Sequence, residues 1–281
     1  MAMTRRKFLG AVAVVGAGSA AGLEGFLVEP HSLEVTHHKV GREDPSGGPT
    51  LRIVQITDLH LEDVNDHVVR VAEAVNRSLP DIVTITGDSV NGARGLGALG
   101  DFLDLLASGP PKYAIYGNWE RWAGIDPGNL GATYEARNGR LLVNESVVHQ
   151  QGGAEVLITG LDDMVEGEPD YARAMAARPP APNHLLLEHC PEFRDHLAPS
   201  EPIPSLMLSG HTHGGQVNLF GWAPVLPRGS GRYVRGWYRD RQRGGPVRPD
   251  LYVSRGIGTV TLPVRFGSPP EIAVFDWSLA A

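Results

Sequence analysis

The sequence is short of several features that define whole classes of protein. Only one of its 281 residues is cysteine, Cys190, so no internal disulfide can hold the fold. Basic residues are outnumbered by acidic ones, 25 to 32, and this balance argues against nucleic acid as the main partner. Its 42% hydrophobic and 20% charged residues are ordinary values for a globular protein. They exclude an extended disordered chain and a multi-span membrane protein.

Glycine, proline and histidine are, by contrast, plentiful. The chain has 35 Gly and 22 Pro without a Gly-x-y period, which excludes collagen and favours a loop-rich enzyme. Eleven His in an acidic chain invite a search for metal ligands. A serine hydrolase is disfavoured, because no G-x-S-x-G turn follows a predicted strand.

The N-terminus predicts an export address. Arg5-Arg6 precedes residues 8–23, an uncharged run rich in Ala and Gly that is shorter than the roughly 20 residues of a spanning helix. This pattern resembles a twin-arginine signal. We therefore expect residues 1–28 to be a signal or a retained anchor, since Phe26-Leu27-Val28 extends the apolar stretch; a basic, flexible N-terminus is the alternative. The expected location is across the cytoplasmic membrane, periplasmic or in the cell envelope, with the twin-arginine export machinery as a partner.

The rest of the chain predicts a lead-in, residues 29–50, with an edge strand at 33–39, and then one domain, 51–281. Short apolar runs alternate with helical periodicity over the first half of that domain, which indicates βαβ units and a largely parallel sheet. The second half predicts short strands with hairpin-like breaks at 144–145 and 152–153, and a helix from Pro191. The predicted fold class is α/β, with two mixed sheets in a sandwich flanked by helices.

Polar side chains follow five of the predicted strands, where open α/β sheets place their sites. The segments are Asp58-Leu59-His60, Gly87-Asp88, Gly117-Asn118, Glu188-His189 and Gly210-His211-Thr212-His213. Imidazole and carboxylate ligands suit Mn, Zn or Fe. Asp88 is the natural carboxylate to bridge two cations. In an extended Asp58-x-His60, both side chains point to one face, so both can reach one ion. The same geometry would put His211 and His213 on one side, with one histidine for each ion.

With these motifs in this order, the chain resembles the calcineurin-like metallophosphoesterases over about residues 51–276. The resemblance implies two divalent ions, one held by Asp58, His60, Asp88 and His213, the other by Asp88, Asn118, His189 and His211. It also implies a phosphate-ester or phosphoanhydride hydrolase in which Asp88 and Asn118 serve catalysis. The strings at 210–216 and 252–258 resemble the exported or membrane-associated bacterial branch, which includes UDP-2,3-diacylglucosamine hydrolases.

Trp119 departs from the family pattern, which has His after Gly-Asn. That His is credited with stabilising the transition state or protonating the leaving group, and an indole cannot transfer a proton at neutral pH. The change favours a diphosphate or an activated ester, as in a lipid-linked or nucleotide diphosphate. A phosphomonoesterase or phosphodiesterase with another substrate, and a metal-retaining binding protein without turnover, are the alternatives.

Two further groups of residues suggest substrate contacts. Arg255 and Arg265 could bind phosphate, with a structural role equally open for each, and Trp119 could line the substrate site. The loop 214–249 mixes aromatic with arginine side chains, which suits peripheral membrane contact or a lipid substrate; a well-packed loop is the alternative. Its members are Phe220, Trp222, Val225, Leu226, Tyr233, Trp237 and Tyr238, with Arg228, Arg232, Arg235, Arg239, Arg241 and Arg243.

Overall fold

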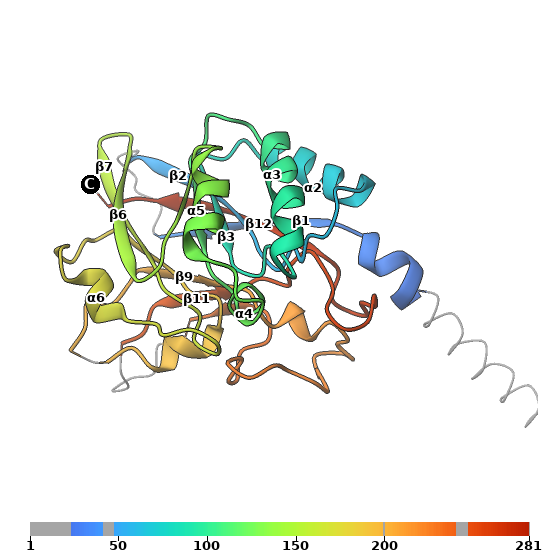
Figure 1. Cartoon of the computed structure of the whole chain (residues 1–281). Coiled ribbons are helices and arrows are strands. Elements are labelled where there is room, and N and C mark those ends of the chain that lie inside the picture. Colours follow the sequence, from blue (N-terminus) through green and yellow to red (C-terminus); the bar gives the residue numbers. More distant parts are fainter. Residues whose placement is uncertain (1–23, 42–47, 199, 240–246, 281) are drawn as a thin grey trace, which may run out of the picture.

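A computed structural model describes residues 24–41, 48–198, 200–239 and 247–280 (Figure 1). In these ranges the strands form two six-stranded sheets. The first has the order β1 (Glu34–Val40), β12 (Glu271–Ser278), β2 (Thr50–Ile56), β3 (Ile82–Thr86), β4 (Lys112–Ile115) and β5 (Gly139–Leu141). The second has the order β10 (Gly236–Tyr238), β11 (Asp250–Val253), β9 (Leu206–Ser209), β8 (His184–Leu187), β7 (Ala154–Gly160) and β6 (Glu145–Gln151). The predicted two-sheet α/β class is confirmed.

Both sheets are mixed, and each has a parallel centre. In the first, β2, β3, β4 and β5 are parallel, while β12 pairs antiparallel with β2 and parallel with the edge strand β1. In the second, β11, β9, β8 and β7 are parallel, and β10 and β6 are antiparallel edges. The predicted edge strand at 33–39 is β1, so part of the lead-in segment belongs to the first sheet.

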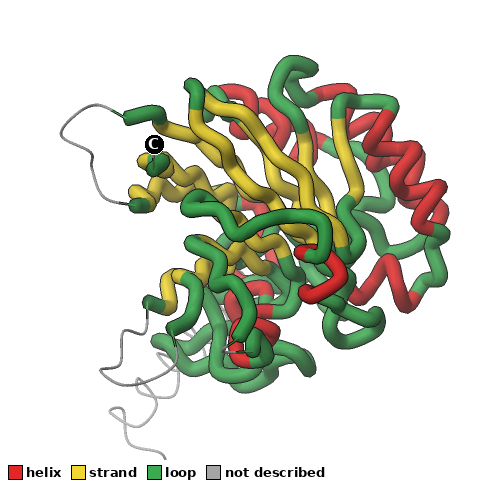
Figure 2. Tube along the Cα trace, turned by 90° about the vertical axis from the view of Figure 1, so that its left-hand side faces the viewer, coloured by secondary structure: helices red, strands yellow, loops and turns green. Residues whose placement is uncertain are grey.

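Helices cover the outer face of the first sheet (Figures 1 and 2). They are α2 (Asp66–Arg77), α3 (Leu96–Leu105) and α5 (Pro127–Glu135). Val68, Val71 and Val75 lie on one face of α2 at helical spacing and are buried against the sheet. The helix begins where the Asn65 side chain accepts the amides of His67 and Val68. Helix α6 (Tyr171–Met175) covers the outer face of the second sheet.

A continuous apolar layer joins the two sheets. Ile53 and Ile82 of the first sheet pack with Leu185 and Leu206 of the second, and all four are fully buried. This shared core fixes the position of one sheet's strand ends relative to the other's. The site described below depends on that alignment, because it takes side chains from both sheets.

Three local expectations need correction or completion. The break at 144–145 is not a hairpin: β5 pairs with β4 in the first sheet, and β6 opens the second. The Asn144 side chain stabilises this connection between the two sheets, since its Oδ1 accepts hydrogen bonds from the backbone amides of Asp162 and Asp170. The helix from Pro191 is a short 3-10 turn, Pro191–Asp195. Helices α4 (Asn118–Trp122) and α5 and strand β10 were not predicted.

The predicted export signal lies mostly outside the described residues, which begin at Glu24 with a short π-helix, Glu24–Val28. Within the described ranges, every helix is too short or too polar to cross a bilayer.

Candidate metal centre

Five strand ends meet at one edge of the sandwich. Asp58 and His60 follow β2, Asp88 follows β3, and Asn118 opens α4 directly after β4. From the second sheet, His189 follows β8, and both His211 and His213 follow β9. The seven predicted ligands thus come together from both sheets, and six of them are buried, with Asn118 partly exposed.

The first cluster joins Asp58, His60, Asp88 and His213. The Nε2 atoms of His60 and His213 are 3.3 Å apart, and His213 Nε2 is 3.3 Å from Asp58 Oδ1. Asp88 Oδ2 lies 3.7 Å from His60 Nε2. Ligands at about 2.0–2.1 Å in a tetrahedron are about 3.3 Å from one another, so these spacings fit a divalent ion.

The second cluster joins Asp88, Asn118, His189 and His211. His189 Nε2 is 3.2 Å from both Asp88 Oδ2 and Asn118 Oδ1. Asn118 Oδ1 is 2.9 Å from His211 Nδ1. Asp88 Oδ2 therefore faces both clusters, which is the placement expected of a bridging carboxylate. Its other oxygen accepts the amide of Trp119 at 2.9 Å.

The hydrogen bonds on the far side of each imidazole decide which nitrogen faces the cluster. His189 Nδ1 donates to the Thr86 carbonyl at 2.8 Å, and His211 Nε2 donates to the Arg228 carbonyl at 2.5 Å. A carbonyl can only accept, so the remaining nitrogen of each ring presents a lone pair when that ring is neutral. Burial opposes protonation of His189, but the neighbouring Asp88 outweighs it and raises the pKa of His189 well above its ordinary value, so a metal ion would take the place of a proton there. Lone pairs of His189, His211 and Asn118 converge on one another. This donor set repels itself unless a cation lies between its members, so the residues fit a metal ion.

The protonation states fit the same role. Burial lowers the pKa of His211 to about 4 and that of His213 well below its ordinary value, so both rings are neutral ligands. Burial works against ionisation of Asp88, but the neighbouring His189 and His60 outweigh it and lower the pKa of Asp88. The centre thus offers an anionic carboxylate, Asp88, together with the neutral imidazoles of His211 and His213.

Five of the predicted ligands have a left-handed backbone. Their φ angles are 52° for Asp58, 50° for His60, 51° for Asp88, 73° for His211 and 50° for His213. The sequence predicted an extended Asp58-x-His60; these two side chains do converge, but through left-handed turns. A non-glycine residue in this region costs about 1–2 kcal/mol, so the loops are strained and held by their surroundings.

Glu120 ties two of the strand-end loops together, a role that the sequence analysis did not assign. Its carboxylate accepts the amides of Asp88 and Gly117, each at 3.0 Å, and also the amide of Ser89. Burial and the nearby Asp88 raise the pKa of Glu120 to about 7. Its place as the fourth residue of Gly117-Asn118-Trp119-Glu120 was a signal that could have found it.

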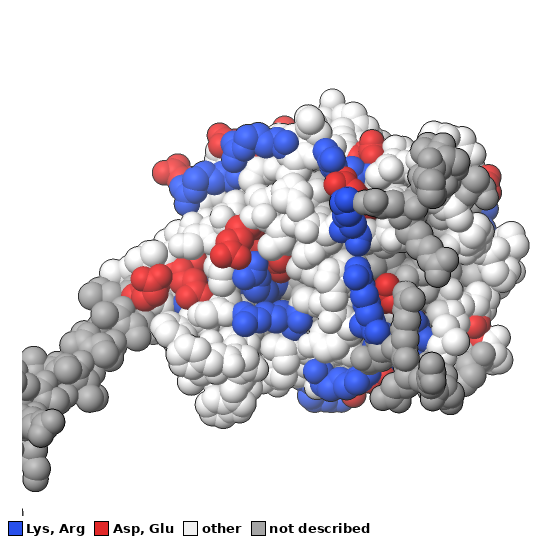
Figure 3. All heavy atoms as spheres, turned by 180° about the vertical axis from the view of Figure 1, so that it is seen from behind, with Lys and Arg blue, Asp and Glu red and all other residues white. Residues whose placement is uncertain are grey.

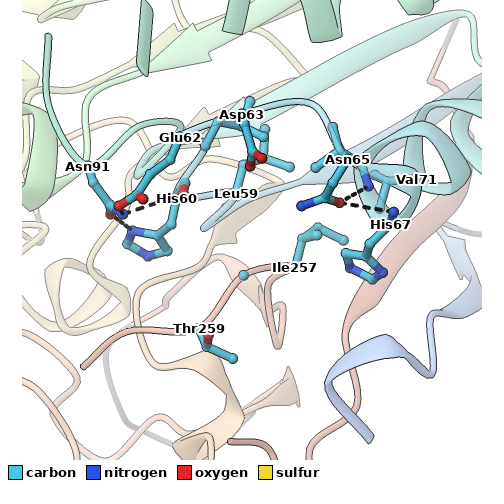
Figure 4. Close-up of a pocket in the computed structure, with 13 residues that line it drawn as sticks. Leu59, His60, Glu62, Asp63, Asn65, His67, Val71, Asn91, Ile257 and Thr259 are labelled. Atoms are coloured by element: carbon cyan, nitrogen blue, oxygen red, sulfur yellow. Dashed lines mark hydrogen bonds between the residues drawn. The ribbon is translucent and has the colours of Figure 1, made fainter. Parts of the chain in front are cut away.

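Asn91 orients His60 and was also missed. Its Oδ1 accepts from His60 Nδ1 at 2.8 Å, while its Nδ2 donates to Glu62 Oε1 at 2.9 Å (Figure 4). These residues line a polar pocket of about 280 Å³ beside the centre. The bond leaves His60 Nε2 to face the first cluster. No spacing in the sequence links Asn91 to His60.

A further buried cluster backs the loop after β8. Cys190 Sγ donates to Asp163 Oδ2 at 3.2 Å, and Glu188 Oε1 accepts the amide of Met164. Asp163, Glu188 and Cys190 have ligand atoms within 4.8 Å of one another. Burial raises the pKa of both Glu188 and Cys190 well above their ordinary values, which favours their protonated forms. The cluster thus supports the loop that carries His189.

The predicted substrate residues have different surroundings. Trp119 packs edge-on against His60, with ring centroids 5.4 Å apart, and lines a pocket of about 570 Å³ next to both clusters. Arg265 is fully buried, and its guanidinium donates to the carbonyls of Arg255, Gly258 and Ser268. The Arg255 guanidinium pairs with Glu271 at 3.2 Å and Glu34 at 2.8 Å.

Neither arginine lines the pocket beside the clusters. Both hold the loop after β11 in place, which is the structural alternative that the sequence left open for each. A phosphate contact from Arg255 stays a prediction, whereas burial keeps Arg265 away from any ligand in that pocket.

Comparison with known proteins agrees with this geometry. Residues 51–215 match the calcineurin-like phosphoesterase family. The chain is 33% identical to the uncharacterized metallophosphoesterase YkuE of Bacillus subtilis, over 97% of both chains. It is 28% identical to the phosphodiesterase YaeI of Escherichia coli, over 98% of this chain and 99% of YaeI. A metallophosphoesterase of Aquifex aeolicus is 28% identical, over 88% of this chain and 92% of its own.

Proposed function

Because the chain belongs to the calcineurin-like phosphoesterase family, and is thus a phosphoester-hydrolysing enzyme, we propose that its substrate is a lipid-linked or nucleotide diphosphate. A molecule resembling UDP-2,3-diacylglucosamine has both parts. The family uses a binuclear divalent metal centre, which supplies a nucleophile from water at neutral pH and polarises the phosphoryl oxygens. The two clusters would hold these ions, with Asp88 shared between them.

The position of Trp119 is our reason for proposing a diphosphate bond and not an alkyl phosphate ester as the bond that is hydrolysed. Its ring lies against His60 and lines the pocket at the centre, where the family pattern has His. An indole N–H can donate a hydrogen bond to a phosphoryl oxygen but cannot protonate a leaving group. An alkyl alkoxide needs that proton, whereas a phosphate leaving from a diphosphate is already a stable anion. General acid catalysis is worth about 10²–10⁴ in rate, so its absence selects against alkyl phosphates.

The pocket beside Trp119 supports an amphipathic substrate. Val217, Val225, Val260, Leu262 and Val264 line its walls, and Asp88 and Asn118 lie at its base. A diphosphate at the clusters would place an attached acyl chain against these aliphatic side chains. Apolar walls of this kind contribute about 25 cal/mol for each Å² of ligand surface that they cover.

Replacing Trp119 by His tests the leaving-group argument. We expect Trp119→His to raise kcat/KM for an alkyl phosphomonoester by tenfold or more, and to change that for a diphosphate little. Equal gains for both substrates would contradict the proposal. Asp88→Asn should abolish turnover of both, while Asp104→Asn, which changes an exposed carboxylate paired with Arg137, should not.

A phosphodiesterase is the second candidate, because YaeI, which matches over nearly its whole length, is named as one. A panel of phosphodiesters and diphosphates, with Mn²⁺, Zn²⁺ or Fe²⁺ added back to apo-protein, separates the two. A protein that binds both ions but turns over no member of the panel would be a metal-retaining binding protein.

We also propose export of the folded, metal-loaded protein by the twin-arginine route. The support is the Arg5-Arg6 pair, which with Lys7 precedes the uncharged residues 8–23. Replacing both arginines by lysine should leave the protein in the cytoplasmic fraction in a cell-fractionation assay. Unchanged export of that variant would refute the route.

A further inference from the structure

Three segments without any Asp, Glu, Lys or Arg line the pocket beside Trp119 or lie next to its lining residues. They are residues 25–28, 217–227 and 256–264, here called the apolar rim. Members of the second and third segments line the pocket itself. Viewed from behind, the molecule shows an uncharged projection at its lower left, below a group of acidic side chains (Figure 3).

Hydrogen bonds from the backbone and from one side chain hold these segments, and the residues that flank them, side by side. Arg265 N donates to the Gly25 carbonyl at 2.9 Å, which joins the first segment to the third. Gln216 Nε2 donates to the carbonyls of Val260 and Leu262, each at 3.1 Å, which joins the second to the third. Asn218 N also donates to the Phe266 carbonyl at 2.7 Å. The rim is therefore one ordered surface, although its parts are far apart in sequence.

The rim exposes large apolar side chains that the fold leaves without cover. Phe220 is fully exposed, Trp222 is 65% exposed and Leu27 is 64% exposed. Two other aromatics of the same long loop behave differently: Tyr233 is buried, and Trp237 packs against Tyr252 at 5.1 Å. The mixed aromatic loop predicted from sequence thus divides into a packed part and an exposed part. Exposed apolar surface of this extent usually marks an interaction site.

We infer that the apolar rim enters the interfacial layer of a lipid bilayer. The aromatic and aliphatic side chains of the rim carry no charge that would have to be desolvated in that layer, and Trp and Phe are favoured there. The chain upstream points to the same partner, because only Glu24 and Gly25 separate Phe26-Leu27-Val28 from the 23 residues that precede the described structure. Those residues include the uncharged run 8–23.

This orientation would turn the mouth of the pocket toward the lipid. An acyl chain could then pass from the bilayer to the aliphatic walls without crossing water, while the diphosphate reaches the clusters. That consequence rests on the proposed function. The membrane contact itself does not, and it can be measured without turnover.

The test uses the full chain and vesicles of phosphatidylcholine and phosphatidylglycerol in equal parts. Leu27→Ser, Phe220→Ser and Trp222→Ser are combined in one variant; none of these residues lines the pocket. We expect the triple variant to lose tenfold or more in vesicle partitioning. A matched variant combines Leu79→Ser, Leu105→Ser and Val148→Ser, which are exposed apolar residues outside the rim, and should bind like the wild type.

Lipids brominated in their acyl chains give a direct readout of insertion. They should quench the tryptophan fluorescence of the wild type, and Trp222→Phe should remove most of that quenching. Unchanged partitioning of the triple variant, or quenching unaffected by Trp222→Phe, would overturn the inference. A dimer in solution that the triple variant dissociates, without vesicle binding by the wild type, would assign the rim to a second copy instead.

Turnover of a soluble chromogenic phosphodiester is measured alongside and should be equal in the wild type and the triple variant. If the wild type binds vesicles through the rim but hydrolyses no diphosphate, the membrane inference stands and the proposed substrate fails. Turnover of a soluble diphosphate without vesicle binding would instead support the proposed substrate and overturn the membrane inference.

Discussion

Removing the Asn91 side chain, which orients His60, should weaken metal binding at the first cluster and leave metal binding at the second cluster unchanged. Asn91 Oδ1 accepts from His60 Nδ1 at 2.8 Å and so keeps the ring in the tautomer whose Nε2 faces the first cluster. Asn91→Ala loses a neutral hydrogen bond, a net cost of about 1 kcal/mol. Free choice between two tautomers adds about 0.4 kcal/mol. The sum corresponds to about tenfold weaker binding, the lower end of the range for residues that support metal ligands.

Isothermal titration of apo-protein with Zn²⁺ or Mn²⁺ measures the effect. We expect two binding steps in the wild type, with only one of them weakened in Asn91→Ala. Asn91→Asp keeps the acceptor and should restore affinity. Asn76→Ala serves as the matched control, since that amide bonds the Leu105 carbonyl and the Ala107 amide away from the clusters. Wild-type affinity in Asn91→Ala, or equal weakening of both steps, would refute the reasoning.

Three further outcomes can be measured by chemical or thermal unfolding. Gly87 has φ of +89°, and a Cβ there would lie 2.6 Å from His189 Nδ1, so Gly87→Ala should lower the free energy of unfolding by at least about 2 kcal/mol. Gly97 has open space around it, so Gly97→Ala should be neutral or stabilising. Burial lowers the pKa of His184 from 6.5 to about 4, so between these values the unfolded state binds a proton that the folded state does not. The free energy of unfolding should therefore decrease by about 3 kcal/mol as the pH falls from 6.5 to 4. His184→Gln should reduce this pH dependence, and an unchanged pH dependence would contradict the prediction. Arg265→Met removes the guanidinium that donates to the carbonyls of Arg255, Gly258 and Ser268, and it should cost about 3 kcal/mol or more. Arg77→Met breaks only an exposed pair and should cost less than about 0.5 kcal/mol.

The sequence was enough to predict the centre because each ligand is tied to the end of a strand. Parallel strands carry their carboxyl ends to one edge, so Asp58, Asp88 and Asn118 could be expected to meet once their strands were recognised. Joining them with His189 and His211 required the second sheet to align its strand ends with the first. No periodicity encodes that alignment, and the family resemblance supplied it.

The supporting residues were out of reach for a different reason. Asn91 and Asp163 act through side-chain hydrogen bonds to groups that follow other strands, and polar residues in loops look alike in sequence. The break at residue 144 was misread because a short strand followed by a polar turn is equally compatible with a hairpin and with a crossing between sheets. Likewise, composition could not separate the exposed Phe220 from the buried Tyr233, since only tertiary packing distinguishes them.

The left-handed backbone at five of the predicted ligands would make the lifetime of the protein depend on its metal supply. Without ions, the strain in these loops has no compensating coordination, and local opening at this edge of the sandwich is easier. Bound ions stabilise the closed form in proportion to the logarithm of their concentration over Kd. In metal-poor cells, proteases would then meet more of the open form and shorten the life of the chain. The turns that aim the ligands would also make the amount of enzyme follow the amount of metal.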